Sequence, residues 1–91
     1  MAKVTVRMFA TLRSASGSAE AQIEAADLLE LERAMRKRFG NGLGEMLGTG
    51  ACPFETVVVL VNGVTVRPDK LAIALLRDGD EVSLFPPISG G

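Results

Sequence analysis

The reactive group that the sequence presents most openly is the carboxylate at the end of its last segment, DGDEVSLFPPISGG. Glycine has no Cβ atom, so the backbone of Gly90 and Gly91 can enter a channel that is too narrow for other residues. Pro86 and Pro87 restrict the backbone just before these glycines and direct the end of the segment away from the preceding strand. A free carboxylate is a poor electrophile and must be activated, for example as a mixed anhydride with AMP formed from ATP. The pattern therefore predicts that the carboxylate of Gly91 is activated and then attacked by a sulfur or amine nucleophile.

A second interpretation of this segment is an ordinary polar chain end, because chain ends are often disordered. Glycine makes up 10 of the 91 residues, so a glycine pair is by itself a modest signal. The pair follows two prolines and a strand-like segment, however, and that combination is far more specific. We therefore expect residues 86–91 to form a flexible tail on a folded domain of residues 1–85.

The composition largely excludes catalysis by conventional side chains. The chain has no histidine and a single cysteine, Cys52. Without histidine there is no Ser-His or Cys-His nucleophile pair and no His-ligated metal, and the commonest general base near neutral pH is missing. One cysteine permits neither an internal disulfide nor a thiolate zinc site. We expect Cys52 to be a bystander thiol, and the protein to bind no metal or cofactor.

Charge and hydropathy limit the partners. The 10 basic and 11 acidic residues leave a net charge of −1, which argues against binding to nucleic acid through many phosphate contacts. No apolar run approaches the roughly 20 residues that cross a bilayer. The first residues, MAKVTVRMFATLR, are typical of a strand rather than of a signal peptide. We expect a cytoplasmic protein with neither nucleic acid nor a membrane as a partner.

Three other patterns that could bind ligands are better explained by structure. The glycines of residues 40–48 follow a helix, whereas a phosphate-binding glycine cluster follows a strand and opens a helix. The basic residues 36–38 are typical of a solvated helix end, with a supporting contact to an acidic partner as an alternative. The acidic residues 78–81 indicate a turn, and no second set of metal ligands accompanies them.

One helix stands out among the elements that must position the tail. Asp27 is placed to cap it with Glu30 in a capping box, and an apolar stripe with steps of three and four residues follows. Glu32 and Arg36 lie one turn apart in the favourable order for an ion pair. Gly40 suits the left-handed residue that ends many helices. Residues 40–54 are expected to form a long glycine-rich loop, in which GEML at 44–47 could form a helical turn.

Strand signals surround this helix. Residues 3–9 and 81–85 alternate with period two, 55–61 is rich in β-branched residues, and 20–24 is a weaker strand beyond a turn at 14–19. Asn62 and Gly63 predict a hairpin to a short strand at 64–67. This order predicts an α+β fold, with a ubiquitin-like β-grasp as the leading candidate: a mixed sheet with one main helix packed on one face, and its first and last strands parallel neighbours.

The same alternation predicts an apolar patch on the sheet face that the helix does not cover. If Val4, Val6 and Met8 face the helix, Phe9 faces the other way, and so does Phe85. An exposed apolar patch of this kind is commonly a binding site. The alternative is that Phe9 packs under the 40–54 segment.

Three segments resemble a known family. MAKVTVRMFATLR at the start, VNG at 61–63 and DGDEVSLFPPISGG at 78–91 are similar to the MoaD family, the small sulfur-carrying subunit of molybdopterin synthase. This family is related to the thiamin sulfur carrier ThiS and to ubiquitin. The resemblance spans essentially the whole chain, although residues 40–56 are longer and more glycine-rich than the family leads us to expect.

The resemblance implies a β-grasp fold and a role as a sulfur carrier that is not catalytic alone. Gly91 would be adenylated by a MoeB-like, E1-type enzyme that uses ATP, and a persulfide donor would convert it to a thiocarboxylate. The tail would then enter a MoaE-like large subunit and deliver sulfur to a cyclic pterin, building the dithiolene that holds molybdenum. Gly90 and Gly91 carry over directly, and the family positions at the partner surface are matched by Phe9, Phe85, Pro86 and Pro87.

Two alternatives remain open. The chain could be a ubiquitin-like modifier that is joined through Gly91 to lysines of other proteins. It could also carry sulfur for another product, such as thiamin, thiolated tRNA or an amino acid. The ending FPPISGG favours the molybdopterin branch over the ThiS type.

Overall fold

A computed structural model of the chain describes residues 2–48 and 52–86. The strands are β1 (Ala2–Met8), β2 (Glu20–Ala25), β3 (Val58–Val61), β4 (Val64–Thr65) and β5 (Glu81–Phe85). The helices are α1 (Ala10–Ser16), α2 (Leu28–Phe39), α3 (Asn41–Leu47) and the short 3-10 helix η1 (Pro68–Lys70).

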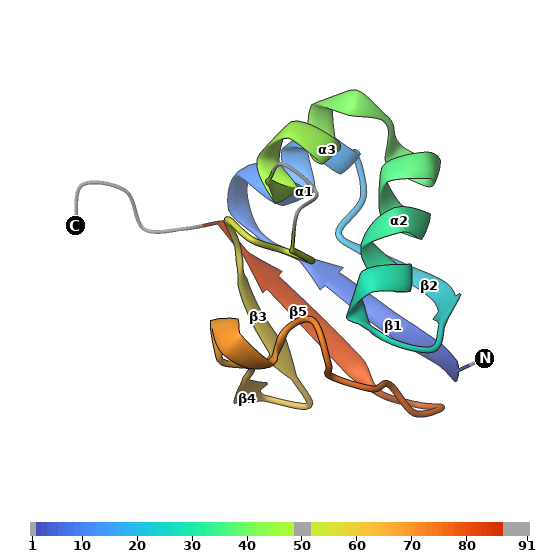
Figure 1. Cartoon of the computed structure of the whole chain (residues 1–91). Helices are drawn as coiled ribbons and strands as arrows, with labels where there is room; N and C mark the ends of the chain where they lie inside the picture. The colour runs from blue at the N-terminus through green and yellow to red at the C-terminus, as the bar shows by residue number, and fades with distance from the viewer. Residues whose placement is uncertain (1, 49–51, 87–91) are drawn as a thin grey trace.

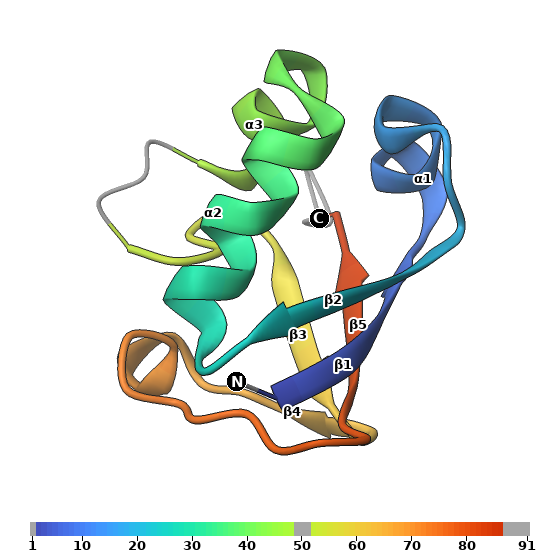
Figure 2. The same cartoon turned by 90° about the vertical axis from the view of Figure 1, so that its right-hand side faces the viewer.

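The strands form one mixed sheet in the order β2-β1-β5-β3-β4 (Figure 1). β1 and β5 run parallel as neighbours, and β2 and β3 flank them in antiparallel pairs. Figure 2 shows α2 and α3 on the same side of this sheet. The α+β class and the β-grasp arrangement predicted from the sequence are therefore confirmed, including the parallel pairing of the first and last strands.

The main helix begins where its capping signal predicts. The Asp27 carboxylate accepts a hydrogen bond from the backbone N–H of Glu30 at 2.8 Å, which satisfies one of the free donors of the first turn. The Glu30 carboxylate accepts from the N–H of Ala26 at 2.9 Å, one residue before the cap. At the other end Gly40 has a positive φ of 81°, but its ψ of −167° is not the left-handed conformation that we predicted.

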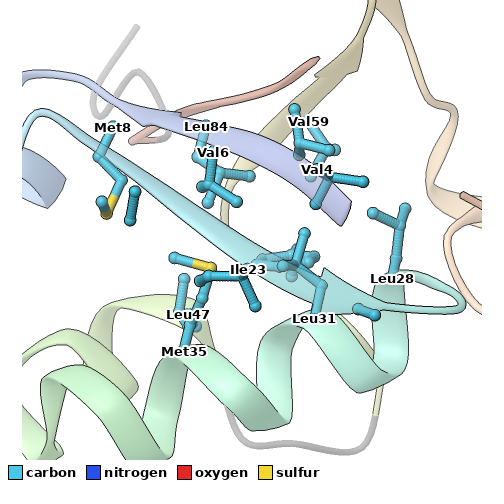
Figure 3. Close-up of a cluster of buried hydrophobic side chains, with 14 of the residues drawn as sticks. Val4, Val6, Met8, Ile23, Leu28, Leu31, Met35, Leu47, Val59 and Leu84 are labelled. Carbon is cyan, nitrogen blue, oxygen red and sulfur yellow. The ribbon is translucent and has the colours of Figure 1, made fainter. Parts of the chain in front are cut away.

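The core lies between α2 and the covered face of the sheet (Figure 3). The alternate residues of β1 and one stripe of α2 are almost completely buried, and each large side chain of this kind stabilises the fold by about 1.5–3 kcal/mol. Figure 3 labels ten members of this core: Val4, Val6, Met8, Ile23, Leu28, Leu31, Met35, Leu47, Val59 and Leu84.

Two segments that were predicted as a turn and a loop contain short helices. α1 replaces the first part of the turn expected at 14–19, and its buried residue Leu12 anchors it to the core. α3 occupies half of the loop expected at 40–54, with Leu43 and Leu47 buried one turn apart. A Cβ atom on Gly44 would lie 3.2 Å from Nη1 of Arg36, so this glycine permits close packing of α3 on α2. The glycines were therefore misinterpreted as a loop signal, although the segment forms a packed helix.

The segment after α3 is fastened to α2 by a buried carboxylate. Glu32 is 2% exposed; its Oε1 accepts from Nε of Arg36 at 3.2 Å, and its Oε2 accepts from the backbone N–H of Phe54. Arg36 also donates through Nη2 to the carbonyl oxygen of Gly48 at 2.8 Å. The expected ion pair is thus present, and its buried partner, Glu32, holds the fully buried Phe54 in place.

The VNG and DGD motifs meet at one end of the sheet. Asn62 and Gly63 both have positive φ, 52° and 84°, as the predicted tight hairpin requires. The Asn62 amide donates to Oδ1 of Asp80 at 2.9 Å and accepts from the N–H of Glu81 at 2.9 Å. Asp78 accepts from the N–H of Lys3 at 2.7 Å. These bonds tie β1, the β3–β4 hairpin and the start of β5 together.

Candidate partner-binding site

The register of the central strands places two phenylalanines together at the opposite end of the sheet. Met8 pairs with Leu84 across β1 and β5, and both side chains are buried against the helices. The next residues, Phe9 and Phe85, therefore face the other way. Their rings are stacked, with centroids 4.4 Å apart and planes 7° apart. The structure thus brings together the two aromatic residues that the sequence predicted to be neighbours.

The backbone of Phe9 continues the parallel ladder by one hydrogen bond. Its N–H donates to the carbonyl oxygen of Leu84 at 3.2 Å, and its φ of −123° and ψ of 155° are still extended. The next residue, Ala10, has a φ of 52° and turns the chain into α1. The stack on Phe85 accounts for the half-buried state of Phe9 without the alternative placement under residues 40–54.

Aliphatic side chains extend the aromatic pair across β3. Val58 lies opposite Phe85 in the β3–β5 register and is 40% exposed. Leu60 shares its side of β3 and is half-buried. We call Phe9, Phe85, Val58 and Leu60 the aromatic patch. No helix covers this side of the sheet in the described part of the chain, so the patch is available to a partner.

The tail begins beside the aromatic patch. Pro86 follows β5 directly and is half-buried. Pro87, Gly90 and Gly91 lie outside the described residues, so the roles predicted for them stay predictions. Because Phe85 and Pro86 are consecutive, a partner that covers the patch also meets the root of the tail.

Charged residues lie next to the patch on the same face. Nε of Arg7 is 3.5 Å from Glu20 on β2 and 3.3 Å from Glu81 on β5. All three side chains are about half exposed, and exposed pairs of this kind stabilise a protein by at most about 1 kcal/mol. These charged side chains therefore add little stability, and they form a polar region beside the aromatic patch.

An open hollow of about 280 Å³ adjoins the patch at Phe9. It lies where β1, α1 and the start of β2 meet, and it was not anticipated because α1 was not predicted as a helix. Its lining consists of Arg7, Met8, Phe9, Arg13, Ala19 and Glu20.

Other kinds of site are not evident in residues 2–48 and 52–86. These residues contain no group of three acidic, histidine or cysteine side chains that could hold a metal ion. None of the helices formed there is both long and apolar enough to cross a membrane. Cys52 is half-buried, and its Sγ lies 3.8 Å from the carbonyl oxygen of Pro53.

Comparison with known proteins identifies the family. The sequence model of the ThiS family matches residues 6–91. Because the match covers nearly the whole chain, the protein belongs to the ThiS family. No curated protein sequence matches it closely enough to count as a relative.

Solved structures resemble the chain over its full length. The small archaeal modifier protein 1 of Methanosarcina acetivorans has a TM-score of 0.82 and 27% identity, over 100% of this chain and 98% of its own. A Pyrococcus furiosus protein assigned as subunit 1 of molybdopterin-converting factor has a TM-score of 0.72 and 32% identity, over 97% of this chain and 100% of its own. Subunit 1 of that factor from Helicobacter pylori, solved in complex with subunit 2, has a TM-score of 0.65 and 31% identity, over 98% of this chain and 99% of its own. The protein is therefore a ubiquitin-like member of a family of sulfur carriers and modifiers.

Proposed function

We propose that the protein carries sulfur for molybdopterin synthesis as a thiocarboxylate on Gly91. The observation that carries the proposal is the stacked pair of Phe9 and Phe85 on the open face of the sheet, directly before the tail. A carrier must dock on enzymes that act on its tail, and a patch at the root of the tail lets one contact both hold the protein and align the reacting end.

The molybdopterin branch is favoured by two observations. The chain is 32% and 31% identical to the two molybdopterin-converting factor subunits, and the Helicobacter pylori protein was solved with its subunit 2. The ending FPPISGG also resembles that branch. We infer that a MoaE-like large subunit covers the aromatic patch during sulfur delivery.

The proposed chemistry takes place entirely at the tail. The Gly91 carboxylate attacks the α-phosphorus of ATP on a MoeB-like, E1-type enzyme; an acyl adenylate forms and pyrophosphate leaves. The terminal sulfur of a persulfide donor then attacks the acyl carbon and AMP leaves, which gives an acyl disulfide. A thiol cleaves the S–S bond, forming a new disulfide and releasing the thiocarboxylate. The carrier itself needs no bound cofactor, because its partners supply ATP, sulfur and catalysis.

Intact-mass spectrometry tests this chemistry. The protein ending at Gly91 is incubated with the E1-type enzyme of its own organism, ATP, a persulfide donor and a thiol. We expect the mass change that corresponds to one oxygen exchanged for one sulfur, and none in a variant that lacks Gly91. Persistent absence of this species from the parent protein would refute the proposal.

A second function is favoured by the similarity to the small archaeal modifier protein 1. In this case the activated Gly91 is attacked by a lysine amine instead of a sulfur nucleophile, and an isopeptide bond forms. Peptide mass spectrometry of trypsin-digested cell extracts would then detect lysines of other proteins that carry residues 78–91 of this chain as a branch, because Arg77 is its last trypsin site. A carrier that serves only sulfur transfer would leave no such remnants.

A further inference from the structure

The hollow beside Phe9 is lined by an arginine whose side chain makes no hydrogen bond or ion pair with the described residues. Among the described residues, no hydrogen bond or ion pair engages the guanidinium of Arg13, which is exposed on α1. Arg7 lines the same hollow, but Glu20 and Glu81 hold it from both sides. Arg13 is therefore the cation that the hollow offers to a partner.

We propose that this hollow binds a carboxylate side chain of the E1-type adenylating enzyme while apolar side chains of that enzyme cover the aromatic patch. This inference rests on the proposed function, because it concerns the enzyme that activates the tail. It adds Arg13 as a docking residue and acidic chemistry as the requirement on the partner.

The position of Phe9 implies that a single partner contacts both the aromatic patch and the hollow. Phe9 belongs to the aromatic patch and also lines the hollow, so the two surfaces are continuous. An enzyme that covers Phe9 necessarily reaches the rim of the hollow. Desolvation of Arg13 by this contact would be unfavourable unless an opposite charge accompanied it. A charge-complementary partner follows from this geometry.

The remaining charges favour a carboxylate. A guanidinium binds a carboxylate through paired N–H donors, which gives orientation as well as attraction. Glu20 on the other side of the hollow contributes one negative charge, which repels a doubly charged phosphate more strongly than it repels a singly charged carboxylate. Arg7 is 3.5 Å from Glu20 and partly neutralises it.

Another hollow in the described part of the chain does not offer the same chemistry. It has a volume of about 310 Å³ and lies between the end of α2 and α3, where Arg36 is its cation. Arg36 is already bound to Glu32 and to the carbonyl oxygen of Gly48. Its contacts are therefore directed into the protein and hold its fold.

Steady-state kinetics of tail activation test the proposal. ATP–pyrophosphate exchange is measured with the purified E1-type enzyme while the concentration of the carrier is varied. We expect Arg13→Glu to raise KM for the carrier by about tenfold or more and to leave kcat within about twofold, because docking is weakened and the tail is unchanged. Arg13→Lys should raise KM less than Arg13→Glu does, since it keeps the charge and loses the paired donors.

Two further variants control the electrostatics. Arg33→Glu makes the same change of charge on α2, which covers the other face of the sheet, and should change KM by less than about threefold. Glu20→Gln removes the negative charge from the hollow and should lower KM, the opposite direction from Arg13→Glu. If Arg13→Glu does not fold, as judged by thermal unfolding, Arg13→Gln replaces it.

The outcomes separate this inference from the proposed function. If the parent protein is not adenylated at all, the proposed function fails and the inference fails with it. If the parent is adenylated but Arg13→Glu (or Arg13→Gln) has the same KM as Arg33→Glu, the inference is wrong and the carrier function stands. A higher KM at Arg13 together with a lower KM for Glu20→Gln supports the inference, whereas the sulfur-carrier function is supported by sulfur on Gly91 in the intact-mass measurement.

Discussion

The two faces of the sheet are built from neighbouring residues of the same strands and yet have opposite properties. On the covered face, Val6 and Leu84 are completely buried under the helices. On the open face, Phe85 is half-buried and Val58 is 40% exposed, although both are as apolar as the core. Successive side chains of a strand point to opposite faces, so the same strands supply both the buried core and the open face. Stability therefore depends on the covered face, and the open face is kept for partners.

The network around Glu32 provides the strongest test of whether stability and partner binding depend on different faces. Glu32→Ala should lower the free energy of unfolding by about 3 kcal/mol, because it leaves Arg36 and the N–H of Phe54 without their buried partner. Urea denaturation measures this loss, and Glu24→Ala, an exposed residue of β2, is the matched control. At a temperature where the variant is folded, its KM with the E1-type enzyme should equal that of the parent. A raised KM would show that the two faces are coupled.

Phe85 tests the open face directly. Phe85→Ala should weaken binding to the E1-type enzyme by about 30-fold, the loss of about 2 kcal/mol that truncation of an aromatic anchor commonly causes. Its free energy of unfolding should fall by only about 1 kcal/mol, because the stack on Phe9 is half exposed. Isothermal titration calorimetry measures the affinity. Ile73→Ala is the control, since Ile73 is 66% exposed outside the patch and should not affect binding. Unchanged affinity in both Phe85→Ala and Phe9→Ala would contradict the patch as a docking site.

The smallest expected effect concerns the junction between the two regions. Ala10 has a φ of 52°, a left-handed conformation that costs a residue with a Cβ atom about 1 kcal/mol. Ala10→Gly should raise the free energy of unfolding by about 0.5 kcal/mol, because the greater chain entropy of unfolded glycine offsets part of the gain. Urea denaturation checks the sign. If the variant is more stable but binds the E1-type enzyme more weakly, the strained turn positions Phe9 for its partner.

Most of the sheet could be predicted from the sequence because its signals are local. Alternation in β1 and β5 places Phe9 and Phe85 on one face, and the Asn62–Gly63 turn defines the hairpin without reference to distant residues. The cap at Asp27 likewise depends on residues within one turn. Such features follow from backbone geometry alone.

The features that were missed depend on contacts between distant residues. Glu32 and Arg36 have the spacing of a surface ion pair, and only the contacts with the distant residues Gly48 and Phe54 reveal that the Glu32 carboxylate is buried. α1 and α3 are seven residues long, too short for a clear helical period, and their serines and glycines are typical of turns. The hollow at Arg13 was hidden for the same reason, since its position depends on α1.

The parallel pairing of β1 with β5 also determines when this protein can fold during synthesis. Thr5 pairs with Glu81, 76 positions later in the chain, so the centre of the sheet cannot close until β5 has left the ribosome. Before that moment the nascent chain can form only local structure, such as the β1–β2 hairpin and α2. The last strand completes the core and stacks Phe85 on Phe9 in the same event, so an unfinished chain has no docking surface to offer the enzymes that would act on it.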